Sequence, residues 1–234
     1  GLAVLPYYLC YRALVRAKVD LIRVRQSVDS ERETIKTGIL AYLQLAKSYT
    51  HSAGPKLIIT RGVSASGKST LTQLLLQSMD AIRIRSDIER KRLFGLKGDE
   101  DSRASIDQGI YSSDATQRTY GKLIELAASI LDAGYSVIVD AVFLDLIQRE
   151  PFQKLAADKH APYLILELTA SPETLRQRIE ARKHDASDAD LSVLEHQLSR
   201  WEPLCEKEER CQIRINTEDF LGIDSLMEKI RANT

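Results

Sequence analysis

Nine consecutive residues have the types and the spacing of a loop that binds phosphate. They match the pattern G-x-x-x-x-G-K-[ST] and extend one residue beyond it: Gly62, Val63, Ser64, Ala65, Ser66, Gly67, Lys68, Ser69 and Thr70. Glycines in such a loop let successive backbone N–H groups converge on phosphate oxygens, and the dipole of the following helix adds positive potential. Lys68 can reach the β- and γ-phosphates, and the Ser69 hydroxyl can ligate Mg²⁺. The sequence therefore predicts that this loop binds a nucleotide together with Mg²⁺.

The segments that flank the loop agree with this interpretation. Leu57-Ile58-Ile59 before it is typical of a short buried strand, and Leu71, Leu74 and Leu75 after it have helical spacing. The alternative is a glycine- and serine-rich turn that joins a strand to a helix and binds nothing.

Asp87 is a candidate general base. It follows Arg85 and Ser86 at the end of the predicted strand Ala81–Arg85, and open α/β sheets bind their ligands at the carboxyl ends of the strands. A carboxylate in this place can accept the proton of a hydroxyl group that attacks a bound γ-phosphate. Alternatively, Ser86 or Asp87 caps the helix that begins at Ile88. The local sequence leaves both interpretations open.

Asp140 is a candidate ligand of Mg²⁺, together with Ser69. It ends the apolar run Val137-Ile138-Val139, and an acid at the end of such a strand holds Mg²⁺ directly or through water in many nucleotide-binding proteins. The alternative is an aspartate that caps the next turn. We favour the metal role because the phosphate-binding loop is present.

Arg178 and Arg182 are candidate catalytic cations, alongside Lys68. They are four residues apart in a helical pattern after the fourth predicted strand, so they share one helix face, and the polar stretch Lys183–Asp190 follows them. As part of a helical lid, they would bring positive charge to the phosphoryl group during transfer. A solvated basic helix face explains the same pattern, and both interpretations stay open.

Strand and helix patterns alternate after residue 55. The predicted strands are Lys56–Thr60, Ala81–Arg85, Tyr135–Ala141, Tyr163–Leu168 and Gln212–Asn216. With helical patterns between them, this order predicts an α/β fold of the P-loop NTPase type: a five-stranded, mostly parallel sheet with helices on both faces and a helical lid. The segment Gly98–Gly109 is predicted to be a loop.

The beginning of the chain predicts a separate N-terminal helical segment. Apolar residues recur there at steps of three and four: Tyr8, Tyr11, Leu14, Val15, Val19 and Ile22. A second helix is predicted to begin at Ser30, with Glu33 completing a capping box. His51–Pro55 breaks the helical pattern and indicates a short linker. The predicted domains are therefore residues 1–54 and 55–234.

Composition excludes several classes of protein. The 234 residues include 33 Lys+Arg and 33 Asp+Glu, so the formal net charge is zero and general nucleic-acid binding is not expected. Three scattered cysteines are too few for a disulfide framework or a structural zinc site, and they indicate a reducing compartment. No apolar run approaches the ~18 residues that span a bilayer. We therefore expect a cytoplasmic protein that binds no membrane.

Five segments together resemble the P-loop kinases of the zeta-toxin/polynucleotide-kinase-like group. They are Gly62–Thr70, Arg85-Ser86-Asp87-x-x-Arg90-Lys91, Tyr111-x-x-x-Ala115-Thr116-x-x-x-Tyr120, Val137–Leu144 and Ala186-Ser187-Asp188-Ala189. The resemblance covers about residues 56–232. It implies a five-stranded parallel sheet with a lid, Asp87 as the general base toward the acceptor hydroxyl, and Arg178 and Arg182 as lid residues that contact the nucleotide phosphates. Val142 stands where many relatives have Thr, so a hydroxyl group near the metal or the acceptor is missing.

The N-terminal segment resembles the end of an aminoglycoside-phosphotransferase-like domain, which precedes this type of kinase in some bacterial proteins. The resemblance rests on Tyr8-x-x-Tyr11-Arg12-Ala13-x-Val15-Arg16-Ala17-Lys18-Val19. The catalytic and nucleotide-binding segments of such a domain are absent from the sequence. We therefore expect residues 1–54 to be the tail of a truncated upstream domain from a longer chain, without an activity of its own.

These observations lead to one main expectation and two alternatives. The main expectation is a kinase that transfers the γ-phosphoryl group of Mg-ATP to a hydroxyl group of a small molecule; GTP is disfavoured because an Asn/Thr-Lys-x-Asp motif is absent. The first alternative is a polynucleotide 5′-kinase or a toxin that phosphorylates a nucleotide sugar, and the zero net charge weakens its nucleic-acid form. The second is a regulatory module that binds ATP with little transfer.

Overall fold

A computed structural model describes four stretches of the chain. These are residues 1–50, 54–96, 112–181 and 191–233. The predicted loop Gly98–Gly109, Arg182 and the polar stretch Lys183–Asp190 lie outside the described residues. Within the four stretches, no helix is both long enough and apolar enough to cross a membrane.

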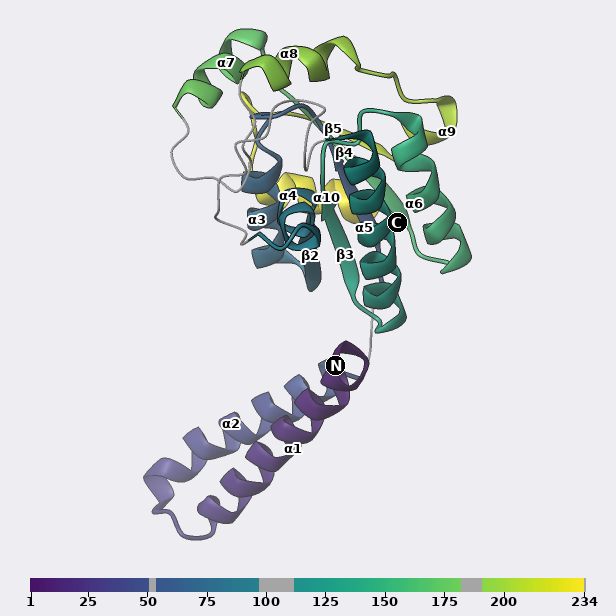
Figure 1. Cartoon of the computed structure of the whole chain (residues 1–234). Coiled ribbons are helices and arrows are strands. Elements are labelled where there is room, and N and C mark those ends of the chain that lie inside the picture. The colour runs from purple at the N-terminus through teal and green to yellow at the C-terminus, as the bar shows by residue number, and fades with distance from the viewer. Residues whose placement is uncertain (51–53, 97–111, 182–190, 234) are drawn as a thin grey trace. The chain divides into compact units, whose positions relative to one another are not determined.

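Residues Gly1–Gly54 form one compact unit, a pair of helices joined by a short turn (Figure 1). The elements of this unit are a 3-10 turn at Leu2–Val4, α1 at Leu5–Val24 and α2 at Asp29–Ser48. The predicted capping box at the start of α2 is wrong. The helix begins one residue before Ser30 without a side-chain cap, and the Glu33 carboxylate accepts a hydrogen bond from Lys36 (2.6 Å).

Small side chains occupy the buried positions of this helical pair. Among the described residues of this unit, the buried ones are Ala13, Ala17 and Ala46. Larger apolar side chains are exposed. In α1 they include Tyr7, Tyr8, Tyr11, Leu14, Val15, Val19, Leu21 and Ile22. Several of these recur at steps of three and four, so they follow one face of the helix. This helical pair therefore buries little apolar surface of its own.

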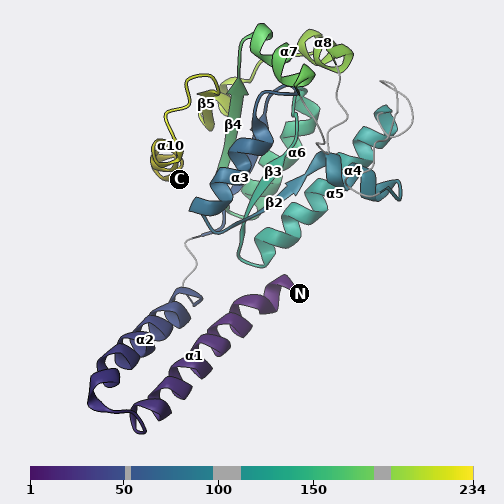
Figure 2. The same cartoon turned by 90° about the vertical axis from the view of Figure 1, so that its left-hand side faces the viewer.

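The larger unit is built on a parallel sheet (Figure 2). Its strands are β1 (Leu57–Arg61), β2 (Ala81–Arg85), β3 (Ser136–Asp140), β4 (Tyr163–Thr169) and β5 (Gln212–Asn216). They form one five-stranded sheet in the order β2-β3-β1-β4-β5, and all neighbouring pairs are parallel. The five predicted strands are confirmed to within one residue at each end, and so is the α/β fold. The central strands are apolar because both of their faces are buried.

Helices lie between the strands of the larger unit, as the alternating pattern predicted. They are α3 (Lys68–Ser78), α4 (Ser86–Leu93), α5 (Ser113–Asp132), α6 (Leu146–Asp158), α7 (Pro172–Glu180), α8 (Leu191–Ser199), α9 (Glu206–Glu209) and α10 (Ile223–Ala232). The helix α10 begins at Ile223, and the segment between β5 and this helix is irregular. The reason is that the Glu218 carboxylate accepts hydrogen bonds from the N–H and the hydroxyl of Ser171 (3.0 and 2.8 Å), which holds this segment in an irregular path.

Helices cover both faces of the sheet (Figure 2). On one face, α3 and α10 pack against β1, β3, β4 and β5 in a cluster that includes Leu75 and Ile230. On the other face, the ring of Phe143, which lies between β3 and α6, meets two rings edge to face. Its centroid is 5.2 Å from that of Tyr120 in α5 and 5.0 Å from that of Phe152 in α6. Because all strands run in one direction, the segments that follow them meet at one edge of the sheet.

Two buried arginines lie near this edge. Arg61, the last residue of β1, pairs with Glu167 of β4, and the ring of Trp201 lies 3.9 Å from its guanidinium carbon. Arg149 of α6 pairs with Glu208 (2.6 Å). Burial alone would raise the pKa of Glu208, but its hydrogen bonds with Arg149 and with the backbone of residue 205 outweigh burial and lower that pKa.

The same arginines also form hydrogen bonds with residues 200–209, the segment between α8 and β5, which we call the strap. Arg61 also donates to the carbonyl oxygen of Glu202, and Arg149 donates to that of Pro203 (3.4 Å). A further hydrogen bond from Arg149 reaches the carbonyl oxygen of Leu144 (2.6 Å), in the segment between β3 and α6. Charged side chains thus bind backbone carbonyls that no helix or strand satisfies.

We predict that Arg149→Met destabilises the protein by about 3–5 kcal/mol, because it leaves the Glu208 carboxylate buried without its partner. The control is Lys122→Met, which removes the exposed pair Lys122–Glu125 (2.9 Å) and should cost less than about 0.5 kcal/mol. Urea denaturation at pH 7 measures both free energies of unfolding. Similar losses in the two variants would contradict a structural role for the buried pair.

Candidate functional site

The predicted phosphate loop joins the end of β1 to the start of α3. Gly67 has a left-handed backbone (φ +92°), which a residue with a side chain adopts only with strain. At Gly62, a Cβ atom would lie 2.6 Å from Ser66 Oγ and 2.7 Å from the carbonyl oxygen of Leu168, so there is no room for a side chain. Both glycines are therefore needed for the path of the loop. Its backbone amides lead directly into an 11-residue helix, whose N-terminus favours an anion.

The side chain of Lys68 folds back against the loop. Its ammonium group donates hydrogen bonds to the carbonyl oxygens of Gly62 (2.9 Å) and Val63 (2.8 Å). These bonds hold a positive charge beside the loop amides. The geometry is that of a cationic cradle for phosphate groups.

Ser69 and Asp140 lie side by side, although 71 positions separate them in the sequence. The Ser69 hydroxyl donates to Asp140 Oδ2 (2.9 Å), and the hydroxyl of Thr72 donates to the same oxygen (3.3 Å). A hydroxyl and a carboxylate oxygen are ligands that Mg²⁺ accepts, so the residues present fit this metal. The described residues contain no cluster of three or more His, Cys, Asp or Glu side chains that could hold a metal by themselves. Water and phosphate oxygens would have to complete its shell.

Two arginines of β2 surround this pair. Arg83 donates to the carbonyl oxygen of Ser69 (3.0 Å) and to the hydroxyl of Thr72 (3.0 Å), and Arg85 Nε lies 3.7 Å from Asp140 Oδ2. The sequence did not point to Arg83. Its alternation with Arg85 on one face of the strand was the available signal.

Asp87 lies in the first turn of α4, at the carboxyl end of β2. Among the described residues its helix has no side-chain cap, which argues against the capping alternative. Burial raises the pKa of Asp87 and the negative charge of Asp140 raises it further, while Arg85 and Lys68 act in the opposite direction. Asp87 therefore lies close enough to the loop lysine and to Asp140 to feel both charges. A carboxylate with a raised pKa is suited to accept a proton.

Side chains of α4 and α5 form hydrogen bonds with each other and with the segment after β3. Arg90 donates to the hydroxyl of Thr116 (3.1 Å), and the backbone N–H of Phe143 donates to the hydroxyl oxygen of Tyr120 (3.3 Å). Burial raises the pKa of Tyr120 to about 12, so this hydroxyl keeps its proton at neutral pH. These residues come from the segments that carry the family resemblance.

Arg178 contacts the loop from α7. Its guanidinium donates to the hydroxyl of Thr217 (2.8 Å), to the carbonyl oxygen of Thr217 (3.3 Å) and to that of Ala65 (3.3 Å). The segment after β5 thus lies beside the loop, which the sequence did not suggest. The second predicted lid arginine, Arg182, lies outside the described residues.

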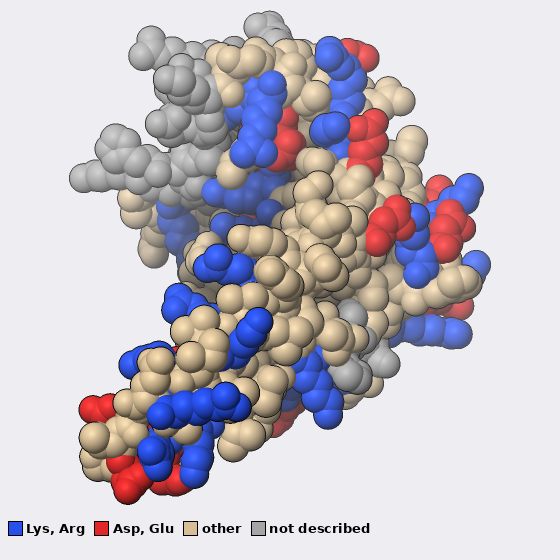
Figure 3. Space-filling view, turned by 90° about the horizontal axis from the view of Figure 1, so that it is seen from below, with Lys and Arg blue, Asp and Glu red and all other residues tan. Residues whose placement is uncertain are grey.

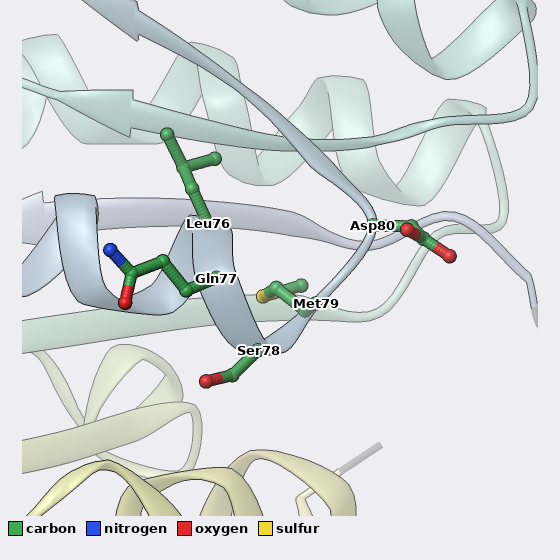
Figure 4. A pocket seen from close by; sticks show the side chains of 5 residues that line it. All are labelled: Leu76, Gln77, Ser78, Met79 and Asp80. Carbon is green, nitrogen blue, oxygen red and sulfur yellow. The ribbon is translucent and has the colours of Figure 1, made fainter.

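A hollow at the opposite end of α3 has no part in this site. It is lined by Leu76, Gln77, Ser78, Met79 and Asp80 (Figure 4). These residues end α3 and lead into the amino end of β2. The loop precedes the other end of the helix, about 16 Å away at 1.5 Å per residue.

Comparison with known protein families identifies one family model that matches the region containing this site. A family model described as an AAA domain, AAA_33, matches residues 57–204. The matched region runs from β1 into the strap and includes Lys68, Ser69, Asp87 and Asp140. The chain belongs to this family.

The relatives in curated collections are longer proteins. An uncharacterized protein of Mycobacterium tuberculosis (strain H37Rv) is 29% identical over 187 residues, which are 80% of this chain and 37% of that protein. A protein of Mycobacterium bovis matches with the same values. The chain thus spans a little over a third of the length of these relatives.

Solved structures share the fold. A putative kinase from Chloroflexus aurantiacus aligns with a TM-score of 0.60 at 24% identity, over 77% of this chain and 99% of the other. Kti12 of Chaetomium thermophilum in complex with ADP-AlF3 aligns at 0.57 and 16% (76% and 98% covered). A sugar kinase from Janibacter sp. aligns at 0.55 and 18% (76% and 93% covered). The larger unit therefore has a P-loop kinase-like fold.

We predict that Asp87→Asn raises the melting temperature of the nucleotide-free protein at pH 7 in the presence of a chelator. A raised pKa means that the folded state disfavours the ionised carboxylate, so this group lowers stability as the pH rises through that pKa. The amide carries no charge, and the difference should shrink as the pH falls toward about 4, because the carboxyl group of the unfolded chain then also becomes protonated.

Thermal unfolding at pH 4, 5, 6 and 7 tests this expectation. The control is Asp158→Asn, an exposed residue of α6, which should leave the melting temperature unchanged at each pH. A loss of stability in Asp87→Asn at pH 7 would show that the carboxylate is not destabilised by its surroundings.

Proposed function

We propose that this protein is an ATP-dependent phosphotransferase that transfers the γ-phosphoryl group of Mg-ATP to a hydroxyl group of a small molecule. The observation that carries the proposal is the hydrogen bond between Ser69 and Asp140 (2.9 Å), next to a loop whose lysine is already in place. It brings together the hydroxyl and the carboxylate that would hold Mg²⁺. When bound, Mg²⁺ would neutralise charge on the phosphate oxygens.

We assign a different role in the transfer to each residue of the site. Lys68 and the loop amides bind the phosphates and stabilise the charge that develops on them. Asp87 accepts the proton of the acceptor hydroxyl as its oxygen forms a bond with the γ-phosphorus, and the bond to the β-phosphate oxygen breaks to release ADP. Arg178, together with Arg182 in a lid, would supply further positive charge and exclude water.

A small acceptor fits the available observations better than a nucleic acid. The formal net charge of the chain is zero, which does not favour a general nucleic-acid binder. Figure 3 shows side chains of both signs on the face seen from below. Neighbours of the same fold include a gluconokinase from Sinorhizobium meliloti (TM-score 0.50, 20% identity) and an APS kinase of Mycobacterium tuberculosis (0.51, 16%). Within the P-loop kinases, we place the protein in the zeta-toxin/polynucleotide-kinase-like group because of the segments around Asp87 and Tyr120.

We further propose two domains, residues 1–54 and 55–234, of which the first is the tail of an upstream domain in a longer chain. The exposed apolar face of α1 supports this proposal, because a helical pair with three buried alanines gains little from burial. The greater length of the Mycobacterium relatives agrees with it.

Lys68→Ala should lower the transfer rate on the order of 10²-fold, because it removes the cation that faces the phosphates. The assay follows γ-labelled ATP with a panel of hydroxyl-bearing metabolites and separates transfer to the acceptor from transfer to water. Lys154→Ala, an exposed residue of α6, is the control and should behave like the wild type. Equal Mg-ATP affinity and equal turnover in wild type and Lys68→Ala would refute the assignment of the loop.

Asp87→Asn and Asp140→Asn should impair different steps: the first should abolish transfer, and the second should weaken the binding of Mg²⁺. Asp87→Asn should bind Mg-ATP with near-normal affinity and lose transfer, because the amide cannot accept a proton. Asp140→Asn should require more Mg²⁺ for half-maximal activity, because an amide oxygen is a weaker ligand than a carboxylate. A Mg²⁺ titration of both variants distinguishes the roles. If Asp87→Asn phosphorylates the acceptor normally, the base is another residue.

A further inference from the structure

The side chain of Gln197 in α8 forms a hydrogen bond with the backbone of the phosphate loop. The backbone N–H of Ser64 donates a hydrogen bond to Gln197 Oε1 (2.6 Å). Ser64 is buried, with 6% of its surface exposed, so this amide needs a partner within the protein. The sequence did not single out Gln197, which lies 133 positions away.

The partner of Gln197 belongs to the same peptide unit that holds Lys68. The carbonyl oxygen of Val63 accepts the hydrogen bond from Lys68 Nζ (2.8 Å), and the N–H of Ser64 is the other end of that peptide group. In a trans peptide the C=O and the N–H point in opposite directions. Gln197 therefore anchors this peptide from the side opposite to the lysine, which fixes the direction of its carbonyl oxygen.

Further contacts keep α8 in place against the loop. Val63 and Ala65 of the loop share an apolar cluster with Leu175 of α7 and Leu194 of α8. Arg178 binds the carbonyl oxygen of Ala65 from α7 (3.3 Å). The loop backbone thus forms hydrogen bonds with Arg178 of α7 and with Gln197 of α8, and the apolar cluster packs both helices against the loop.

The strap fixes the end of α8. Arg200 pairs with Asp145 (3.0 Å), and the Glu202 carboxylate accepts the backbone N–H of Leu146 (2.6 Å) at the start of α6. Gln197 is therefore presented by a helix that is tied to the body of the unit, so its carboxamide has a defined position.

We propose that Gln197 is a positioning residue that acts on Lys68 through the Val63–Ser64 peptide. Without the hydrogen bond to Gln197, this peptide can rotate and its carbonyl oxygen no longer holds the ammonium group where the phosphates bind. The inference rests on the proposed nucleotide binding and extends it, because it assigns the orientation of the phosphate lysine to a residue of α8. Gln197 itself touches no reacting atom.

A double-mutant cycle with Lys68 tests the proposal. The dissociation constant of Mg-AMPPNP is measured by calorimetry for wild type, Gln197→Met, Lys68→Ala and the double variant. Methionine keeps the length of the side chain and removes the hydrogen-bond acceptor. We expect Gln197→Met to weaken binding about five- to tenfold, as for one lost hydrogen bond to a buried group. In the Lys68→Ala background, the same change should weaken binding less than about twofold, because its effect passes through the lysine.

Each outcome of the cycle decides one question. A merely structural role for Gln197 predicts equal factors in both backgrounds, and this result would overturn the proposal, as would normal binding by Gln197→Met. Glu195→Gln, an exposed position on the same helix, is the control and should change neither background. Should Gln197→Met fail to fold, Gln197→Ala is measured in the same cycle. If the wild type binds no Mg-AMPPNP, it is the proposed function that fails.

Discussion

The position of β1 between β3 and β4 is the constraint on which the site depends. Ile59 pairs with Val139 on one side and with Ile165 on the other, so the ends of these strands lie next to one another. The pairing of the backbones therefore places the loop after β1 next to Asp140 at the end of β3, whatever side chains these segments carry. The short distance between the Ser69 hydroxyl and the Asp140 carboxylate follows from this pairing. A change of register would separate the groups that a metal and a triphosphate need together.

Charges buried beside the sheet bind irregular segments as well as neighbouring strands. Replacing a buried ion pair with apolar side chains is often neutral or stabilising, so the pairs of Arg61 and Arg149 are not explained by stability alone. Both guanidinium groups also bind carbonyl oxygens of the strap, and Arg149 binds that of Leu144. Several donors on one rigid plane can satisfy a carboxylate and nearby carbonyls at once, which lysine cannot do. The arginines therefore join the strap, and with it α8, to the core.

The sequence was sufficient for features that local patterns encode. Apolar runs predicted the five strands, and the glycines, Lys68 and Ser69 predicted the loop whose geometry the structure shows. The contacts of Gln197, Arg83 and Thr217 were not predicted, because each depends on a distance between segments that sequence spacing does not contain. The predicted capping box at Ser30 was wrong for a related reason: Glu33 has a competing partner in Lys36, and the residue types alone do not decide between them. The roles of Asp87, Asp140 and Arg178 remain predictions from chemistry and position.

The stacking of Trp201 on Arg61 has a practical consequence. The chain contains one tryptophan, and this residue lies in the strap, partly buried against the cluster that contains Val63 and Leu194. Indole emission depends on the polarity and the charge around the ring, and here a guanidinium lies 3.9 Å from the ring centroid. Within these 234 residues, all tryptophan fluorescence therefore originates at the junction of β1, α8 and the strap. Trp201 is thus an optical reporter of this junction, and no label has to be introduced into this chain.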